Sequence, residues 1–221
     1  MGDTGRMLWQ YWPLFGLRVT TPRLVLRYPD DNDAATLAEV GAAGVHDPST
    51  MPFQIPWTDL APPQQQRETL RYLWRTRASW SPEHWEMPMA VVLDGSVIGV
   101  QGVLANDFPT LRAVETGSWL GLPHQGKGVG TEMRQAILHL VFAGLGARYA
   151  HTAAFDDNAA SIAVTRKLGY EQDGTRRVVR RGEPAWQTTY RMSREDWEQR
   201  RRDDIVMDGL EPCLELFGIA P

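Results

Sequence analysis

A glycine-rich segment that joins an extended run directly to an amphipathic helix constrains the fold of this chain most. Residues 116–122 read as a short strand, and apolar residues recur every three or four positions over 133–145, as on one face of a helix. Between these runs, three glycines occur within residues 126–130. The first N–H groups of a helix have no intrahelical acceptor, and the helix dipole is positive there. The segment therefore predicts a phosphate-binding turn at the start of a helix.

Three phosphate-binding patterns compete for this turn. A nucleoside-triphosphate P-loop, GxxxxGK[ST], fits from Gly121 to Lys127, but Gly128 stands where a magnesium-binding hydroxyl is required. A dinucleotide fingerprint, GxGxxG, fails because the glycines occur at every second residue. The third pattern, Q/R-x-x-G-x-G/A, is matched by Gln125, Gly128 and Gly130. It resembles the pyrophosphate-binding turn of the GCN5-related N-acetyltransferase (GNAT) family. A plain loop leading into a helix is the remaining alternative.

The composition favours a single domain with no nucleic-acid or membrane partner. The 221 residues are 43% hydrophobic, which is enough for one sizeable core. A net charge of −4 and scattered basic residues argue against nucleic-acid binding. The single cysteine, Cys213, excludes an internal disulfide, and the histidines show no metal-ligand spacing. No run approaches the length of a membrane helix and no signal-peptide pattern is present, so we expect a cytoplasmic protein without a metal.

The order of apolar and turn-forming residues predicts an α/β fold with a mixed central sheet of about seven strands. Strands are expected at 24–26, 87–93, 96–105, 114–122, 149–155, 170–179 and 186–192, and helices at 33–41, 64–80, after 130, at 158–168 and from 193. Asp33 is expected to cap the first helix, and Asp94-Gly95 to form a two-residue hairpin turn.

The chain divides into an aromatic N-terminal arm (1–20), a domain (20–202) and a C-terminal tail (203–221). The arm and the tail carry enough apolar residues either to pack against the domain or to form the contact of a homodimer. Of these two, we favour the dimer.

The whole order of elements resembles the GNAT family, and within it the branch of the ribosomal-protein alanine acetyltransferases (RimJ/RimL-like). The resemblance covers about residues 20–200 and rests on TPRLVLR at 21–27, ETGSWL at 115–120, the turn at Gln125, and DNAAS at 157–161 with LGY at 168–170. The chain also resembles an actinobacterial subgroup in which some members use succinyl-CoA.

This resemblance implies direct transfer of an acyl group from acetyl-CoA or succinyl-CoA to a primary amine. The residues expected to bind the donor are Leu120, Leu122, Gln125, Gly126, Lys127, Gly128, Val129, Gly130, Thr131, Asn158 and Ser161. A free N–H near Leu120 is expected to polarise the thioester carbonyl. Lys127 is open to a second interpretation as a solvated lysine, and Asn158 as a helix cap.

Two side chains are expected to be catalytic. Glu115 matches a carboxylate that serves as general base in the RimL branch, and it lies beside an apolar strand that favours uptake of a proton. Ser161 is the expected acid near the leaving thiolate, because Thr165 stands where many family members have a tyrosine. The alternatives are a solvated carboxylate for Glu115 and an ordinary first-turn helix residue for Ser161.

The acceptor pocket is expected to include Phe53 or Trp57, with core packing as the alternative for both. The acceptor itself is left open between a protein N-terminus, a lysine and a small amine. Arg176-Arg177 and Arg180-Arg181 are expected to be a solvated strand and turn. Three other functions compete: a catalytically silent CoA-binding protein of this fold, a succinyl-CoA-dependent lysine acyltransferase, and a P-loop nucleotidase, which Gly128 disfavours.

Overall fold

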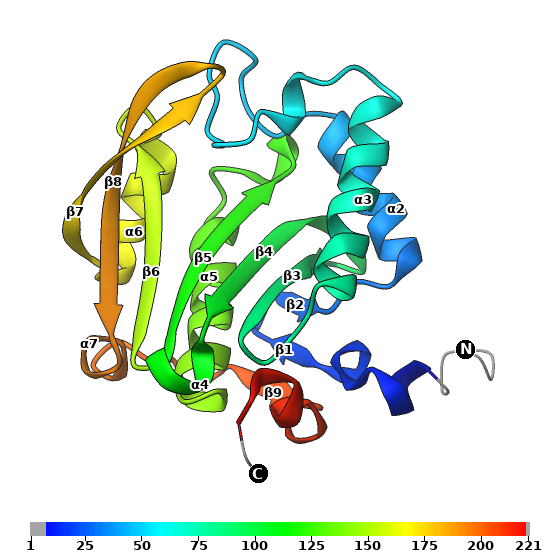
Figure 1. Cartoon of the computed structure of the whole chain (residues 1–221), viewed down its shortest axis with the longest axis vertical. Helices are drawn as coiled ribbons and strands as arrows, with labels where there is room; N and C mark the ends of the chain where they lie inside the picture. Colours follow the sequence, from blue (N-terminus) through cyan, green and yellow to red (C-terminus); the bar gives the residue numbers. More distant parts are fainter. Residues whose placement is uncertain (1–7, 220–221) are drawn as a thin grey trace.

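The chain folds as an α/β sandwich around one mixed sheet. The computed structural model describes residues 8–219 (Figure 1). Within that part of the chain, nine strands form the sheet in the order β7-β8-β6-β5-β4-β3-β2-β1-β9. The strands are β1 (Arg18–Thr20), β2 (Leu24–Arg27), β3 (His84–Leu93), β4 (Ser96–Asn106), β5 (Ala113–Leu120), β6 (Tyr149–Phe155), β7 (Glu171–Arg180), β8 (Glu183–Ser193) and β9 (Val206–Asp208).

Helices cover both faces of this sheet. The α-helices are α2 (Asp31–Ala42), α3 (Gln64–Ala78), α4 (Phe108–Leu111), α5 (Val129–His139), α6 (Ala159–Leu168) and α7 (Arg194–Glu198). Shorter helical segments are η1 (Pro13–Gly16), η2 (Trp57–Asp59), η3 (Leu122–His124), η5 (Glu211–Phe217) and the π-helical turn η4 (Leu140–Gly144). Among the described residues, none of these helices has the length and apolar character needed to cross a membrane.

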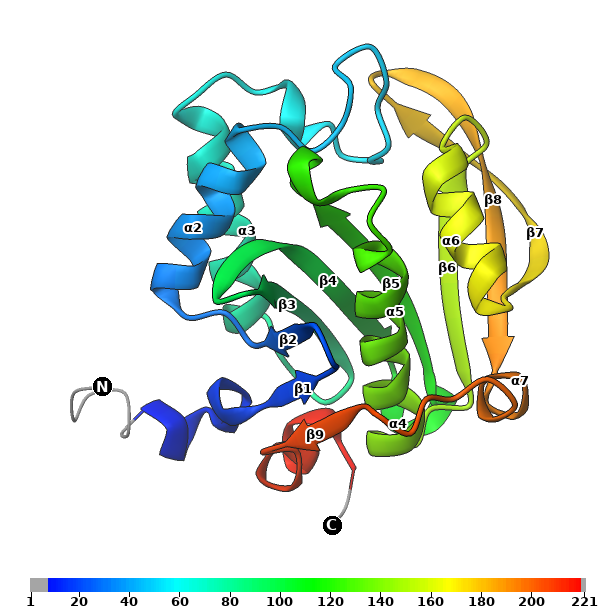
Figure 2. The ribbon, with the colours of Figure 1, turned by 180° about the vertical axis from the view of Figure 1, so that it is seen from behind.

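The two faces of the sheet carry different parts of the core. α2 and α3 pack on one face through a small apolar cluster that includes Leu37, Leu73 and Val100. α5 and α6 lie over the other face (Figure 2), where the main core encloses residues such as Ile137 and Phe142. Successive side chains of a strand point to opposite faces, so the central strands supply both clusters.

The central strands β5 and β6 separate, and this opening positions the site described below. Their parallel pairing ends at Glu115 opposite His151. Beyond that point β5 stays paired with β4 as far as Leu120, while β6 stays paired with β8 as far as Phe155. Figure 1 shows the two strands diverging. The result is a wedge-shaped gap in the middle of the sheet.

The backbone of β5 presents N–H groups to this gap. The N–H of Gly121 donates to the Ile98 carbonyl at 2.9 Å, which fixes the alternation of the antiparallel ladder between β5 and β4. In such a ladder, every second residue turns its N–H away from the paired strand. The N–H groups of Ser118 and Leu120 therefore face the side from which β6 has departed.

The predicted sheet had about seven strands, and each of those seven is present. The two additional strands are β1 and β9, which lie within or next to the predicted arm and tail. β1 pairs antiparallel with both β2 and β9. Each of the two has three residues, too few to show alternation in the sequence, and they become strands because a partner satisfies their backbone groups.

Asp33 does not cap the first helix as predicted. The cap of α2 is Asp30, whose carboxylate accepts from the N–H of Asp33 at 2.8 Å. The Asp33 side chain is buried and accepts two hydrogen bonds from Arg27, at 2.9 and 2.6 Å. A carboxylate held in this way is not available to the helix N-terminus, so the acidic residue three positions earlier serves instead.

The tail packs against its own chain. Cys213 and Phe217 are fully buried, and the Phe217 ring contacts those of Trp80 and Trp85. Burial raises the pKa of the Cys213 thiol to about 12. Because these side chains are enclosed within one chain, they offer no surface to a second copy. The homodimer stays a prediction.

Candidate functional site

The glycine turn presents free backbone N–H groups at the start of α5. Gly126 and Gly128 have φ of 70° and 78°, a left-handed conformation that favours glycine. The N–H of Glu132 donates to the Gly128 carbonyl, so helical hydrogen bonding begins there and the N–H groups of Val129, Gly130 and Thr131 have no intrahelical acceptor. With the positive end of the helix dipole, this arrangement favours a phosphate group.

Two of the predicted donor-binding residues hold the turn in place. The amide nitrogen of Gln125 donates to the carbonyls of Leu120 and Val45, at 2.8 and 2.7 Å. The N–H of Leu122 donates to the Gly44 carbonyl at 3.1 Å. These bonds connect the turn to the end of β5 and to the segment after α2. The side-chain nitrogen of Gln125 and the N–H of Leu122 are therefore already engaged within the chain.

The turn is also anchored to the start of β2. The Lys127 carbonyl accepts from Arg23 at 3.2 Å, while the Lys127 side chain is exposed. Arg23 in turn forms an ion pair of 2.6 Å with Glu132 on the first turn of α5, and Thr21 donates to the same carboxylate at 2.7 Å. Burial by itself raises the pKa of Glu132, but the hydrogen bonds from Thr21 and Arg23 lower it overall.

The start of α6 faces the same gap from the side of β6. Asn158 is the helix cap, and its side-chain oxygen accepts from the N–H of Ser161 at 3.1 Å. Ser161 is half-buried on the first turn. Thr165, one turn later on the same face of α6, is fully buried.

A buried arginine lies under the gap. Arg134 of α5 is 4% exposed and donates to Thr165 Oγ1 at 3.0 Å and to Ser118 Oγ at 3.2 Å. Its Nε has no hydrogen-bond partner among the described residues, and no carboxylate there pairs with it. Burial lowers the pKa of Arg134, yet an arginine side chain stays protonated in proteins.

A cavity of about 360 Å³ opens where β5 meets α3 and the loop before it. Its walls are Phe53, Ile55, Trp57, Glu68, Thr69, Tyr72, Leu73, Arg75, Glu86, Val100, Gly102, Val103, Leu104, Glu115, Gly117, Ser118 and Trp119. The rings of Phe53, Trp57 and Trp119 follow one another with centroids 5.3 and 5.6 Å apart. Phe53 and Trp57 are half-buried, so neither is enclosed in the core.

Carboxylates stand on the floor of this cavity. Glu86 and Glu115 are both in register with Leu104 on the strand between them, so all three side chains point the same way. Glu115 is 39% exposed and forms an ion pair of 3.2 Å with Arg176 of β7. Glu86 accepts from the hydroxyl of Tyr72 at 2.6 Å, and burial together with the Glu86 charge raises the Tyr72 pKa well above its usual value.

The comparisons with known proteins agree with this geometry. The family model for the acetyltransferase (GNAT) domain matches residues 23–171. The chain belongs to the GNAT family.

Solved structures of GNAT proteins share the fold. The ribosomal L7/L12 α-N-protein acetyltransferase RimL, in complex with coenzyme A, superposes with a TM-score of 0.65 at 18% identity, over 80% of this chain and 97% of that one. RimJ of Mycobacterium smegmatis, with a CoA disulfide, gives 0.63 at 18%, over 82% and 87%. A GCN5-related N-acetyltransferase of Brucella melitensis gives 0.65 at 19%, over 82% and 80%.

The fold brings only some of the predicted GNAT site residues together. Glu115, Phe53 and Trp57 share the wall of the cavity, whereas Ser161 does not line it. The turn residues and Asn158 lie beyond the gap, at the starts of α5 and α6. Among the described residues, no group of three or more histidine, cysteine, aspartate or glutamate side chains is arranged to hold a metal ion.

The arginines predicted to be solvated include three that bind other parts of the chain. Arg176 pairs with Glu115, as described above. Arg180 donates to Asp157 at 2.9 Å and to the Met51 carbonyl, and Arg181 makes two hydrogen bonds to Asp59, at 2.7 and 2.6 Å. Their partners are far away in sequence, so the charge pattern alone carried no sign of them. Through Met51 and Asp59, Arg180 and Arg181 join the tip of the β7–β8 hairpin to the loop that contributes Phe53 and Trp57.

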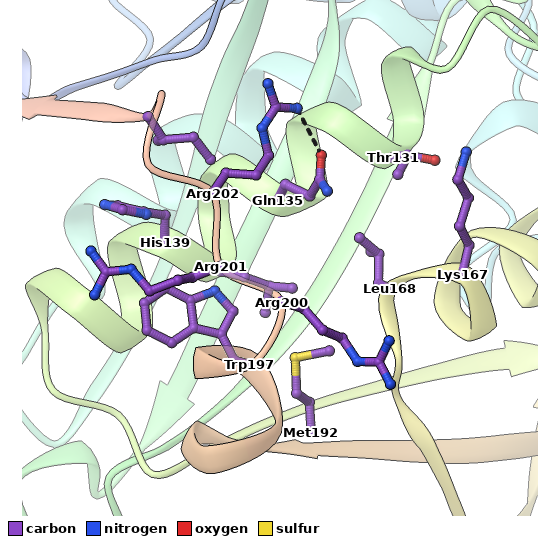
Figure 3. Close-up of a pocket in the computed structure, with 12 residues that line it drawn as sticks. Thr131, Gln135, His139, Lys167, Leu168, Met192, Trp197, Arg200, Arg201 and Arg202 are labelled. Atoms are coloured by element: carbon purple, nitrogen blue, oxygen red, sulfur yellow. Dashed lines mark hydrogen bonds between the residues drawn. The ribbon is translucent and has the colours of Figure 1, made fainter.

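A second cavity, of about 140 Å³, lies between α5, α6 and α7 (Figure 3). Its walls carry Lys167, His139 and the consecutive arginines 200–202. Arg202 donates to Gln135 at 3.0 Å and pairs with Asp204 at 2.6 Å. Burial and the nearby Arg201 lower the pKa of His139. Of the predicted GNAT site residues, only Thr131 lines this cavity, which shares no wall residue with the cavity that contains Glu115.

Proposed function

We propose that this GNAT protein is an N-acyltransferase that moves an acetyl or succinyl group from coenzyme A to a primary amine by direct transfer. The observation that carries the proposal is that the glycine turn and the cavity lie on the two sides of the same gap in the sheet. The anion-binding turn at Gly128 lies on one side of the gap between β5 and β6. The cavity that contains Glu115 lies on the other, and Ser118 belongs both to its wall and to the gap.

The residues present fit an acyl-CoA donor. The free N–H groups at 129–131 suit its pyrophosphate. The gap-facing N–H groups of Ser118 and Leu120 suit the pantetheine arm and the thioester oxygen. The unpartnered Nε of the buried Arg134 suits a negative charge at the same place. Coenzyme A supplies the acyl group as a thioester, whose sulfur leaves as a thiolate.

The side chains divide the chemistry as follows. Glu115 accepts the proton that the attacking amine must lose. The N–H of Leu120 polarises the thioester carbonyl. Ser161, at the open end of the gap, delivers a proton to the departing sulfur. Arg176 holds the Glu115 carboxylate beside the gap at 3.2 Å.

The cavity supports an acceptor whose amine is attached to an apolar group. Phe53, Trp57 and Trp119 give it an aromatic wall, and Glu115 and Glu86 attract a positively charged amine. Such an acceptor is the first residue of a protein chain, a lysine side chain or a small amine. The name of the RimL structure specifies a ribosomal-protein N-terminus for that enzyme. We extend that acceptor class to this chain. The cytoplasmic location and the homodimer stay predictions.

A thermal-shift panel with CoA, acetyl-CoA, succinyl-CoA and ATP–magnesium tests donor binding, because a ligand that binds only the native state raises Tm. We expect stabilisation by the CoA compounds and none by ATP. Release of free thiol from each acyl-CoA, with an N-terminal peptide and with phenethylamine, then tests transfer. Binding of CoA with no turnover of any acceptor would favour the silent CoA-binding alternative. Stabilisation by ATP–magnesium alone would contradict the family assignment of the turn.

A further inference from the structure

The buried guanidinium of Arg134 carries an inference that rests on the proposed function and goes beyond it. We propose that Arg134 is a positioning residue that makes the hydroxyl of Ser118 a hydrogen-bond donor to the sulfur of the departing coenzyme A. Neither residue was predicted to be catalytic from the sequence. Arg134 occupies a polar position in an amphipathic helix, where a solvated arginine is the ordinary expectation.

The two hydrogen bonds of Arg134 have a fixed direction. A guanidinium has five N–H donors and no acceptor. Arg134 therefore donates both bonds, at 3.2 Å to Ser118 Oγ and at 3.0 Å to Thr165 Oγ1. Each hydroxyl accepts through a lone pair and keeps its own proton free to donate. Donation from a charged group also polarises the O–H bond and strengthens that second donation.

Ser118 presents its hydroxyl to the gap. It lies on β5 beyond Glu115, where the pairing with β6 has ended. Thr165 of α6 is fully buried, so its hydroxyl holds the guanidinium in place and does not meet a ligand. The anion-binding start of α5 lies on one side of Ser118, and the cavity with Glu115 on the other. A thioester bridging these two places has its sulfur in the gap, within reach of the Ser118 hydroxyl.

The buried charge of Arg134 needs a negative partner. An unpaired buried cation is unfavourable unless an anion joins it. Tyr170 could offer a negative charge to Arg134 only if its hydroxyl lost a proton. Burial raises the pKa of Tyr170, so the side chain stays neutral. The hydroxyl of Tyr170 lies 3.4 Å from Thr116 Oγ1. The described chain therefore supplies no counter-charge, and a thiolate formed in the gap does.

The transfer step is balanced with these groups. The amine nitrogen forms a bond to the thioester carbon, the carbon–sulfur bond breaks, and its electron pair stays on sulfur. Glu115 takes one proton from the amine and releases it to solvent, and the thiolate, held by the Ser118 hydroxyl, takes one proton from Ser161, which is reprotonated from solvent. The products are an amide and the free thiol of coenzyme A, with no oxidant or reductant involved.

The test is a titration of the thiol of bound coenzyme A, which needs no turnover. Complexes of CoA with the wild type, Arg134→Met and Arg134→Lys are titrated, and the thiolate is followed by its ultraviolet absorbance. Calorimetry first confirms that each variant binds CoA. We expect the wild type to lower the midpoint by about one pH unit relative to free CoA. Arg134→Met should abolish this shift and Arg134→Lys should restore part of it. Equal midpoints in the wild type and Arg134→Met would overturn the proposal.

Kinetics provide a second readout. Arg134→Met should lower kcat about tenfold, with little change in the amine KM, and Ser118→Ala should act in the same direction. Arg166→Met, on the exposed side of α6, is the matched control and should behave as the wild type. The losses should be equal for acetyl-CoA and succinyl-CoA. A loss confined to succinyl-CoA would overturn the proposal, because Arg134 would then bind the acyl carboxylate.

These outcomes separate the inference from the proposed function. If CoA does not bind the wild type, the proposed function fails. If CoA binds and acyl transfer occurs but the thiol midpoint is that of free CoA, only the role of Arg134 fails. Ser118→Ala gives an independent answer if Arg134→Met does not fold.

Discussion

The two faces of β5 carry charges of opposite sign in opposite settings. Glu115 points into the cavity of about 360 Å³, where it is 39% exposed and paired with Arg176. On the other face, Arg134 of α5 reaches Ser118, is 4% exposed and has no carboxylate partner within residues 8–219. An exposed pair contributes little to stability, whereas a buried unpaired cation lowers it. This contrast supports the proposal that both charges serve the reaction rather than the fold, with Arg134 doing so at a cost in stability.

Replacement of Glu115, on the cavity side of β5, should have the largest effect on kcat. Glu115→Gln keeps the shape of the side chain but cannot accept the proton of the amine, so kcat should fall by about 10²- to 10⁴-fold. Because the carboxylate is half-exposed, Tm should stay near that of the wild type. Steady-state kinetics with the best acceptor and a thermal melt check both parts. Near-wild-type kcat would remove Glu115 from the mechanism.

A substitution in the glycine turn should have the next largest effect, on the affinity for CoA. Gly128→Val puts a β-branched residue at φ 78°, a strained conformation that distorts the N–H groups of the turn. The affinity for CoA should fall by about ten- to a hundredfold, consistent with about 1–3 kcal/mol of strain. Calorimetry with CoA measures the loss. Gly182→Val is the control, since Gly182 has a similar φ of 83° in the exposed β7–β8 turn.

Replacement of Arg134, on the buried side of β5, should change activity and stability in opposite directions. Arg134→Met replaces the buried cation by a shorter apolar side chain, which removes the cost of burying an uncompensated charge. We expect Tm to hold or rise while kcat falls about tenfold. Chemical denaturation of the protein without ligand measures the free energy of unfolding. A large fall in that free energy would mean that Arg134 is needed for the fold, and the contrast between the faces would disappear.

Removal of an aromatic side chain from the cavity wall should change KM for the amine acceptor alone. Trp57→Ala removes an aromatic ring from the cavity, so KM for phenethylamine should rise about tenfold while KM for methylamine changes little. CoA affinity should stay the same. Trp186→Ala is a matched control, because that side chain is 54% exposed and does not line the cavity. Equal effects on both amines would argue against an apolar subsite.

The smallest effect is an acid dependence at the anchor of the turn. The pKa of Glu132 is lowered overall in the folded protein, so its ion pair with Arg23 stabilises the fold above the ordinary value of 4.5. This contribution is lost as the pH falls through the lowered value. Tm of the wild type should therefore decline more steeply below pH 4.5 than that of Glu132→Gln. Parallel curves would contradict this; Glu198→Gln, in an exposed pair, is the control.

Much of the fold could be predicted because its signals are local. The hairpin between β3 and β4 turns at Asp94 and Gly95, which have φ of 50° and 79°, as the two-residue turn requires. The limits of β6 match the predicted 149–155. The short strands β1 and β9 could not be predicted, because three residues show no period and the pairing joins opposite ends of the chain. The cap of α2 was misplaced because the burial of Asp33 depends on Arg27.

The candidate site divides in the same way. Sequence by itself determined the glycine turn at the start of α5, since positive φ at Gly126 and Gly128 and the free N–H groups of a helix start follow from neighbouring residues. Only the tertiary structure decided that Arg176 pairs with Glu115 and that Arg134 lies buried with no carboxylate from the described part of the chain beside it. Those contacts span 61 and 16 residues, and the burial of a charge depends on everything packed around it. Local sequence fixes backbone conformation, whereas desolvation and ion pairing are properties of the assembled fold.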